Sequence, residues 1–146
     1  LVDPRDVGPG KVVSSDEWEV ISAPAVHVEP WLDSLAYRVN TSSGSVVFTG
    51  DTAPCESVSK LAEGADVLVV TCIGRQEEIE GTPEGVYMCG TTGAGKMAAK
   101  AGVKKLILVH NALIARHGKM ELGIADVVKE FDGEVIFGEE LLTVQL

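Results

Sequence analysis

Two apolar segments of this chain each run directly into a residue type that binds metals. Ser45-Val46-Val47-Phe48-Thr49 continues into Gly50-Asp51-Thr52, and Lys105-Leu106-Ile107-Leu108-Val109 continues into His110. Short, continuous apolar runs of this kind predict buried strands. In a sheet whose faces are covered by helices, ligand sites form beyond the strand ends. We therefore expect Asp51 and His110 to converge at one edge of a sheet.

The remaining pattern predicts an α/β fold, because an antiparallel start gives way to strands that alternate with helices. The short strands predicted for the first third are Glu17–Ile21, Ala25–Val28 and Ala36–Val39. After Asp51 we predict a helix from Pro54 to Gly64, a strand over Ala65–Val70 and an exposed loop over Gln76–Gly85. A helix over about Ala94–Ala101 follows, and then one over about Met120–Glu130 that buries Ile124, Val127, Val128 and Phe131. The predicted end is hairpin-like, formed by Glu134–Phe137 and Leu141–Val144.

Length, charge and cysteine content limit the domain organisation, the partners and the location that we expect. A chain of 146 residues, 45% of them hydrophobic, fits a single domain over 1–146. Its formal net charge of -10 argues against nucleic acid or an anionic membrane surface as a partner, since both require a basic footprint. The sequence has neither a bilayer-spanning apolar run nor a secretory signal at Leu1–Arg5, so we expect a cytoplasmic location. Three cysteines, Cys55, Cys72 and Cys89, favour free thiols.

A second motif suggests a different class of function. The segment Gly90–Lys96 satisfies the phosphate-loop pattern G-x-x-x-x-G-K, which would indicate nucleotide binding. The next residue, Met97, lacks the hydroxyl that this pattern uses to hold magnesium. The same glycines are also typical of a flexible turn into a helix, with Thr91 or Thr92 as the N-cap, and we favour this interpretation over nucleotide binding.

Three segments resemble one known family. Phe48 to Pro54, Leu61 to Leu68 and Ala98 to His110 are similar to the C-terminal half of a metallo-β-lactamase-fold hydrolase, in the branch of ribonuclease Z and the arylsulfatase-like enzymes. The closing segment Phe131 to Leu141 resembles the last strands of that branch. The resemblance implies half of an αββα sandwich, with a mixed sheet and helices on one face.

The resemblance also implies site residues. It gives Asp51 the role of a carboxylate that bridges two metal ions and His110 that of a further ligand, while the catalytic residues stay unassigned. Carboxylate and imidazole suit zinc, and also iron or manganese, so up to two such ions are expected once the site is complete. No organic cofactor is implied. An assisting histidine of the branch would fall near Met88 or Cys89, where this sequence has none.

Several residues are expected at the edge of this site. We place His27, Thr52 and Cys89 there. His27 is open to two interpretations, a residue at the site edge or a hydrogen-bonded strand residue, and we favour the structural one over a metal ligand. His117 is expected in an exposed loop. The family's paired-histidine motif and a further ligand histidine are expected upstream of this chain.

These expectations lead to two hypotheses on function. In the first, the chain contributes part of a binuclear metal site that hydrolyses a phosphodiester, sulfate or ester when a missing N-terminal half completes it. In the second, it is a non-catalytic oligomerising or interaction module. Both predict a homo-oligomer or a complex with a separate N-terminal-half chain, because half of such a fold exposes an apolar sheet face.

Overall fold

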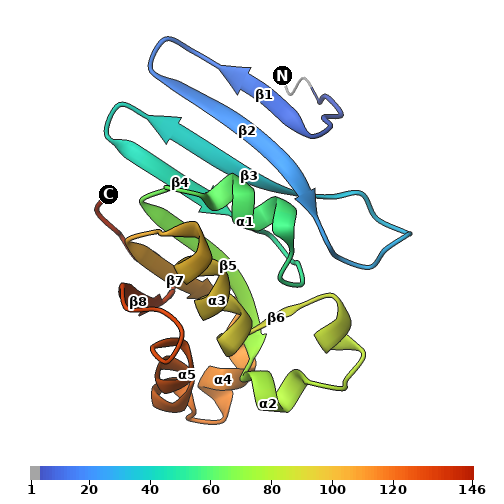
Figure 1. The fold of residues 1–146 in the computed structure, drawn as a ribbon, viewed down its shortest axis with the longest axis vertical. Helices are drawn as coiled ribbons and strands as arrows, with labels where there is room; N and C mark the ends of the chain where they lie inside the picture. The colour runs from blue at the N-terminus through green and yellow to red at the C-terminus, as the bar shows by residue number, and fades with distance from the viewer. Residues whose placement is uncertain (1–3) are drawn as a thin grey trace.

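A computed structural model describes residues 4–146, apart from the side chains of residues 112 and 113. The chain forms one mixed sheet with helices packed mainly on one face (Figure 1). In sheet order the strands are β1 (Gly10–Ser14), β2 (Trp18–Ala25), β3 (Ser34–Thr41), β4 (Gly44–Phe48), β5 (Val67–Gly74), β7 (Lys105–Val109) and β8 (Glu134–Phe137), and β6 (Cys89–Gly90) pairs with β5 off this path. The helices are α1 (Glu56–Ala62), α2 (Gln76–Ile79), the 3-10 turn η1 (Glu84–Val86), α3 (Thr91–Ala101), α4 (Ala112–Arg116) and α5 (Met120–Val127).

The sheet changes character at β4. Strands β1 to β4 pair antiparallel, whereas β4, β5, β7 and β8 pair parallel. The predicted antiparallel start followed by α/β units is therefore confirmed. Parallel strands bring their carboxyl ends to one edge, so the segments that follow β4, β5 and β7 share that edge. None of the described helices is both long and apolar enough to cross a bilayer.

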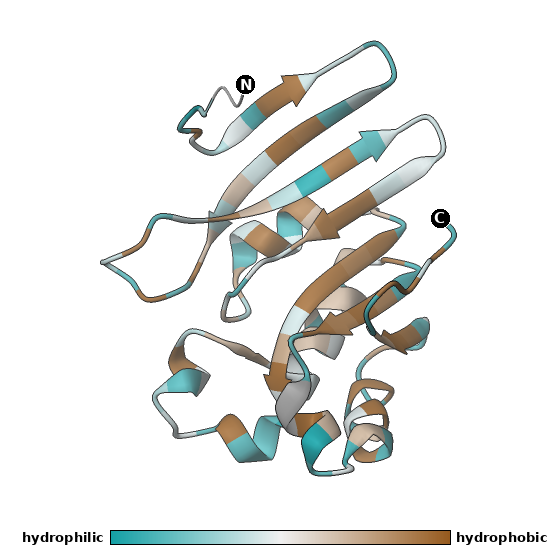
Figure 2. Ribbon diagram, turned by 180° about the vertical axis from the view of Figure 1, so that it is seen from behind, coloured by the Kyte–Doolittle hydropathy of each residue, from teal (hydrophilic) through white to brown (hydrophobic). Residues whose placement is uncertain are grey.

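The register separates the two faces of the sheet, because side chains alternate along a strand and direct partners share a face. Val47, Leu68 and Leu106 are register partners, and each is fully buried under the helices. The opposite face carries a continuous apolar row across five strands, formed by Tyr37, Phe48, Val69, Ile107 and Ile136. Figure 2 shows this side of the sheet, where no helix covers its middle. The predicted exposed apolar face is present only in part: Phe48 is 46% exposed, Ile107 is buried at 8%, and the other members of the row are half-buried.

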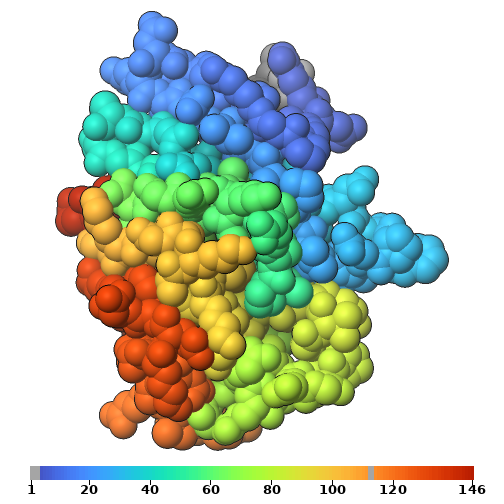
Figure 3. Space-filling model, viewed as in Figure 1, coloured from blue at the N-terminus to red at the C-terminus, as the bar shows by residue number. Residues whose placement is uncertain are grey.

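The N-terminal strands differ from prediction. Glu17–Ile21 and Ala25–Val28 were expected as two strands, but β2 is one strand that continues through Pro24 and ends at Ala25. Pro24 lies past the end of the β1 pairing, where a residue without an N–H is tolerated. The chain then leaves the sheet and projects as the segment 28–33, which stands out from the body of the molecule in Figure 3. Strand β1 was not predicted.

The prediction for the segment before β6 was only partly right. The expected exposed loop over Gln76–Gly85 contains α2 and the start of η1. Ile79 of α2 is buried in a small apolar cluster with Ile73 and Met88. That contact gives the short helix a tertiary anchor, which its acidic sequence does not reveal.

The C-terminal part also departs from prediction. Helix α5 ends at Val127, with Val127 and Phe131 buried as predicted, but Ile124 and Val128 are exposed. The segment Leu141–Val144 is not a strand, and Leu141 is 99% exposed with a φ of 63°. Strand β8 instead forms the parallel edge beside β7. Helix α4 was not predicted.

Candidate metal site

Two loops meet beyond the strand ends through a pair of hydrogen bonds. The backbone N–H of Val26 donates to Oγ1 of Thr52 at 2.9 Å, and the N–H of Ala53 donates to the carbonyl oxygen of Val26 at 2.8 Å. Thr52 is completely buried and also donates to the carbonyl oxygen of Ala53 at 2.8 Å. These bonds join the loop after β2 to the loop after β4. They hold His27 and Asp51, one residue away on each loop, next to one another.

His27 presents one ring nitrogen to Asp51. Its Nε2 lies 4.0 Å from Oδ2 of Asp51, and its Nδ1 lies 3.0 Å from the carbonyl oxygen of Tyr87. A carbonyl oxygen only accepts hydrogen bonds, so Nδ1 carries the proton. In the neutral ring, Nε2 then keeps its lone pair on the side of the carboxylate, which is the arrangement that metal-ligating histidines use.

The expected structural role of His27 describes half of this geometry. The ring is hydrogen-bonded, as predicted, but His27 lies outside any strand, and its other nitrogen faces a carboxylate. A histidine just after a strand gives no signal of this in the sequence, because the contact depends on the hydrogen bonds of Thr52 and Ala53 to Val26.

His110 belongs to the same region. It follows β7 directly, with a φ of 58°, and its side chain is exposed. His110 and His27 line one cavity of about 470 Å³, so the segments that follow β2 and β7 each contribute a histidine to it. The predicted convergence of Asp51 with His110 is not shown by these contacts: Asp51 faces His27, and His110 shares a cavity with His27.

Asp51, His27 and His110 are residue types that bind zinc or iron, but they are too few to complete such a site. Within residues 4–146, no three His, Cys, Asp or Glu side chains gather closely enough to enclose a metal ion. Asp51 has a side chain 41% exposed, and Nε2 of His27, 4.0 Å away, is the only basic nitrogen that the described residues place within that distance of it. Carboxylate and neutral imidazole are hard and borderline ligands of these metals. The chain therefore offers an open edge of donors and no closed cage.

Cys89 does not lie at the site edge, contrary to prediction. Its side chain is fully buried in the main core, while the preceding Met88 lines the cavity. Cys72 of β5 lies opposite Cys89 of β6 in the strand register, and both are free thiols. Burial raises the pKa of Cys72 to about 12, and it raises the pKa of Cys89 well above its ordinary value. Both thiols thus stay protonated near neutral pH, which opposes soft-metal binding.

The phosphate-loop pattern does not form a loop. Thr91 to Lys96 occupy the first turns of α3, whose N-cap is Gly90 and neither of the two threonines. A Cβ at Gly93 would lie 2.8 Å from Cγ of Pro54, and one at Gly95 would lie 3.0 Å from the carbonyl oxygen of Val127. These glycines allow close helix packing, so the geometry contradicts both a phosphate cradle and a flexible turn.

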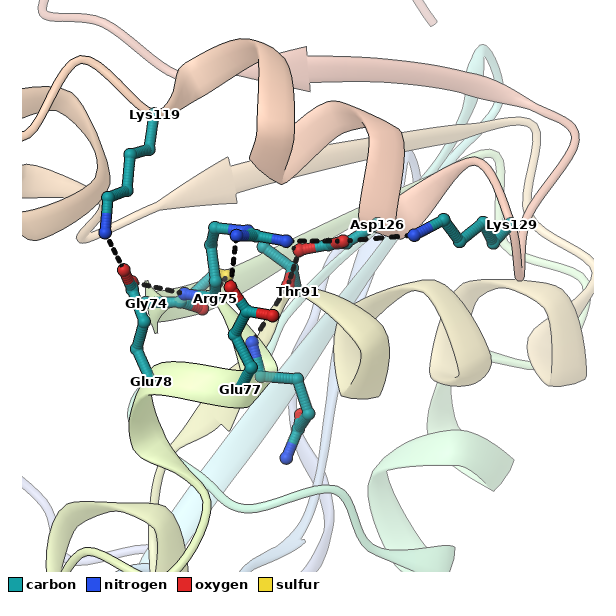
Figure 4. Close-up of polar contacts among 10 residues, drawn as sticks. Gly74, Arg75, Glu77, Glu78, Thr91, Lys119, Asp126 and Lys129 are labelled. Carbon is teal, nitrogen blue, oxygen red and sulfur yellow. Dashed lines mark hydrogen bonds and ion pairs between the residues drawn. The ribbon is translucent and has the colours of Figure 1, made fainter.

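A second polar group at the carboxyl end of β5 escaped sequence analysis (Figure 4). Asp126 of α5 accepts from Nε and Nη2 of Arg75 at 2.7 and 3.0 Å, and from Oγ1 of Thr91 at 3.3 Å. Oγ1 of Thr91 accepts from the N–H of Gln76 at 3.1 Å. Lys129 adds an ion pair to Asp126 at 3.4 Å, Glu77 pairs with Arg75, and Lys119 pairs with Glu78.

Electrostatics in this group follow from its contacts. The donating Arg75 guanidinium holds the pKa of Asp126 below its ordinary value, although burial acts in the opposite direction. The side chains of Arg75 and Asp126 are only 14% and 11% exposed. Such a paired, hydrogen-bonded group is typical of a structural anchor. It fastens α2 and α5 to the N-terminus of α3.

Known proteins resemble this chain in sequence and in fold. The family described as the β-lactamase superfamily domain matches residues 3–111. A ribonuclease Z of Mycobacterium avium is 33% identical over 99% of this chain and 53% of its own length. The fold resembles the metallo-β-lactamase-fold protein YhfI from Bacillus subtilis, with a TM-score of 0.71, 21% identity, and coverage of 88% of this chain and 49% of that one. Human tRNase Z, short form, gives a TM-score of 0.66 at 16% identity, covering 90% and 43%. This chain spans about half the length of these relatives.

Metals occur in solved proteins of this fold. PqqB from Methylobacterium extorquens is a zinc-bound example with a TM-score of 0.66, 15% identity, and coverage of 93% of this chain and 53% of that one. The β-hydroxylase CmlA from Streptomyces venezuelae is a diiron example with the same TM-score, 14% identity, and coverage of 94% and 34%. The match over residues 3–111 shows that this chain belongs to the β-lactamase superfamily, and its mixed sheet and structural neighbours show the metallo-β-lactamase fold.

Proposed function

We propose that this chain supplies part of a metal-dependent hydrolase site in which His27, Asp51 and His110 are metal ligands. The observation that carries the proposal is the approach of His27 Nε2 to Asp51 Oδ2, at 4.0 Å, with Nδ1 fixed by the carbonyl oxygen of Tyr87. Zinc suits these donors best, with iron or manganese as alternatives. The ligands that close the site come from outside this chain.

The chemistry follows the family. Two bound ions would supply Lewis acidity and allow water to attack near neutral pH. The substrate class is a phosphodiester, sulfate or ester, and the name of the ribonuclease Z relatives favours a phosphodiester. In this chain Asp51, His27 and His110 would hold the ions, with the His27 ring fixed by the carbonyl oxygen of Tyr87 and His110 placed directly after β7.

Elemental analysis tests the ligand assignment. Because the donors form an open edge, we expect the purified chain to retain zinc only weakly after dialysis, and the His27→Ala, Asp51→Ala and His110→Ala variants each to retain less zinc than the wild type. His117→Ala is the matched control, because His117 is exposed and does not line the cavity. Equal zinc content in all five proteins would rule out this site. Hydrolysis of bis(p-nitrophenyl) phosphate, assayed in parallel, is expected to be near zero for the chain alone.

We further propose that the helix-free sheet face binds the remaining half of the fold. The relatives of this chain are about twice as long as it is, and Phe48 leaves an apolar side chain exposed in the middle of this face. Alone, the chain would cover that face by self-association, which is the interaction module of the second hypothesis. In sedimentation we expect an oligomer that Phe48→Lys dissociates, whereas Leu141→Lys, at an exposed site off the row, leaves it intact. A monodisperse wild-type monomer would argue against this proposal.

A further inference from the structure

Helix α5 exposes apolar side chains on the side that faces away from the core. Leu122, Ile124 and Val128 are 50%, 37% and 52% exposed, whereas Val127 on the inner side is fully buried. The apolar spacing of the sequence predicted that Ile124 and Val128 would be buried. A cluster of large apolar side chains on one surface helix is typical of an interaction site.

This cluster lies on the side of the sheet that the helices cover. Val135 and Phe137 of β8 pack against the same core as Val127 of α5. Gly123 lies so close to Phe137 that a Cβ there would be 3.0 Å from its ring. Helix α5 therefore covers the face of β8 opposite Ile136, and Figure 3 shows it in orange-red at the surface of this side. The missing half of the fold, which we place on the helix-free face, would leave the cluster exposed.

The exposed face of α5 is centred on a small residue. At about 100° per residue, Glu121, Leu122, Val128 and Lys129 all lie within about 60° of Ala125 around the helix axis. All five residues are exposed. The backbone stays helical at the end of this face, because the N–H of Val128 donates to the carbonyl oxygen four residues earlier at 3.0 Å. Packed helix axes lie about 8–10 Å apart, and a small residue at the crossing point suits a close contact.

The order of residues makes this face complementary to itself. Glu121 lies four residues before Ala125 and Lys129 four residues after it, while Leu122 and Val128 lie three residues before and after it. A two-fold axis through Ala125 would make two α5 helices antiparallel and would exchange positions at equal distances from it. Each Glu121 would then face the partner's Lys129, and each Leu122 would face the partner's Val128.

Charge favours a second copy of this chain as the occupant of this face. Among the described residues, no basic side chain pairs with Glu121. Lys129 contacts Asp126 at 3.4 Å but leaves 71% of its side chain exposed. Antiparallel helices would bring these opposite charges together and would also place opposite dipole ends side by side. The contact is small, so the dimer is expected to be weak and reversible.

We propose that α5 forms a two-fold dimer interface with α5 of a second copy of this chain, centred on Ala125, with Leu122 against Val128 and Glu121 paired to Lys129 across it. The proposal does not depend on the hydrolase site. It uses a different surface from the helix-free sheet face, so the two associations can be separated by experiment.

A charge-swap experiment in sedimentation equilibrium tests this interface. The parent chain carries Phe48→Lys, which removes the sheet-face association, and at rising protein concentration it should dimerise weakly through α5. Glu121→Lys leaves only lysines at the paired positions and Lys129→Glu leaves only glutamates, so each variant alone should lose at least about tenfold in dimer affinity. An equimolar mixture of the two variants should regain the parent's affinity, because both ion pairs form in the heterodimer.

Two further variants complete the test. Glu17→Lys, in the exposed turn between β1 and β2, is the matched charge-reversal control and should leave the dimer affinity unchanged. Ala125→Gln keeps every charge, and its longer side chain fills the crossing point, so the dimer affinity should fall.

Three results would overturn the proposal. The first is a parent chain that stays monomeric at every concentration. The second is a mixture of Glu121→Lys and Lys129→Glu that associates no better than either variant alone. The third is full dimer affinity in Ala125→Gln, which decides the matter even if Lys129→Glu fails to fold because of the negative charge that it adds beside Asp126.

Discussion

Two carboxylates beyond the parallel strands have opposite surroundings. Asp126, beside the end of β5, receives hydrogen bonds or ion pairs from Arg75, Thr91 and Lys129. Asp51, beyond the end of β4, faces only His27 among the described residues, at 4.0 Å. A carboxylate whose acceptor positions are filled contributes to stability, whereas one left open keeps its oxygens for a ligand. The same fold edge thus holds a structural anchor and a candidate binding site.

Removing the satisfied carboxylate should have the largest effect on stability. Asp126→Ala leaves the mostly buried Arg75 and the buried Thr91 without their acceptor, so we expect the free energy of unfolding to fall by about 1–3 kcal/mol. Urea denaturation measures it, with the exposed Asp132→Ala as the matched control. A loss for Asp126→Ala no larger than that of the control would mean that the Arg75 group is not an anchor.

Thr91 should follow with a smaller effect. Its hydroxyl accepts from the N–H of Gln76 and donates to Asp126, and its side chain is fully buried. Thr91→Val keeps the shape and loses both bonds, so we expect a loss of about 1 kcal/mol. Thr91→Ser restores the hydroxyl and should recover part of that stability in the same denaturation experiment. If Ser and Val behave alike, the hydroxyl does not link α2 to α5.

The pH dependence of stability should separate the two carboxylates further. The pKa of Asp126 in the folded state lies below its ordinary value of 3.8. Its stabilising contribution is therefore complete above that value and is lost as the pH falls through the lower, folded pKa. The stability difference between wild type and Asp126→Asn should be constant above about pH 5 and shrink below about pH 4. A difference that grows on acidification would contradict the assignment.

Removing the open carboxylate should have the smallest effect on stability. Asp51 is 41% exposed and makes one contact, at 4.0 Å. We expect Asp51→Ala to change the free energy of unfolding by no more than about 0.5 kcal/mol in the absence of metal. Urea denaturation in the presence of a chelator tests this. A loss of unfolding free energy comparable to that of Asp126→Ala would mean that Asp51 is a structural residue like Asp126.

Sequence reasoning located the strand ends correctly and missed the contacts between them. Apolar runs ending in Asp51 and His110 sufficed to predict β4, β7 and the shared edge, because burial in parallel strands leaves a clear signal. The approach of His27 to Asp51 depends on the buried Thr52 bond to Val26, 26 residues away. The hydrogen bonds between Arg75 and Asp126 join residues 51 positions apart, and the sequence around neither residue predicts them.

Two predictions were wrong because tertiary packing decided the outcome: the turn at the glycines before Lys96 and the placement of Cys89. Gly93 and Gly95 read as a turn because glycine lowers helix propensity, yet tight packing against Pro54 and Val127 requires them inside α3. Similarly, a one-residue shift decides which side chain faces the cavity, and it places Met88 there and Cys89 in the core. Both outcomes are set by tertiary packing.

Nitrogen-15 NMR of the three histidines, followed during a zinc titration, tests the central claim most directly. We expect zinc to shift the Nε2 signal of His27 and the ring signals of His110. Nδ1 of His27 should keep its proton, and the signals of the exposed His117 should not shift. In Asp51→Ala, the His27 response should require a higher zinc concentration. A His27 ring that does not respond, or a His117 ring that responds equally, would contradict the claim that this strand edge is a metal site.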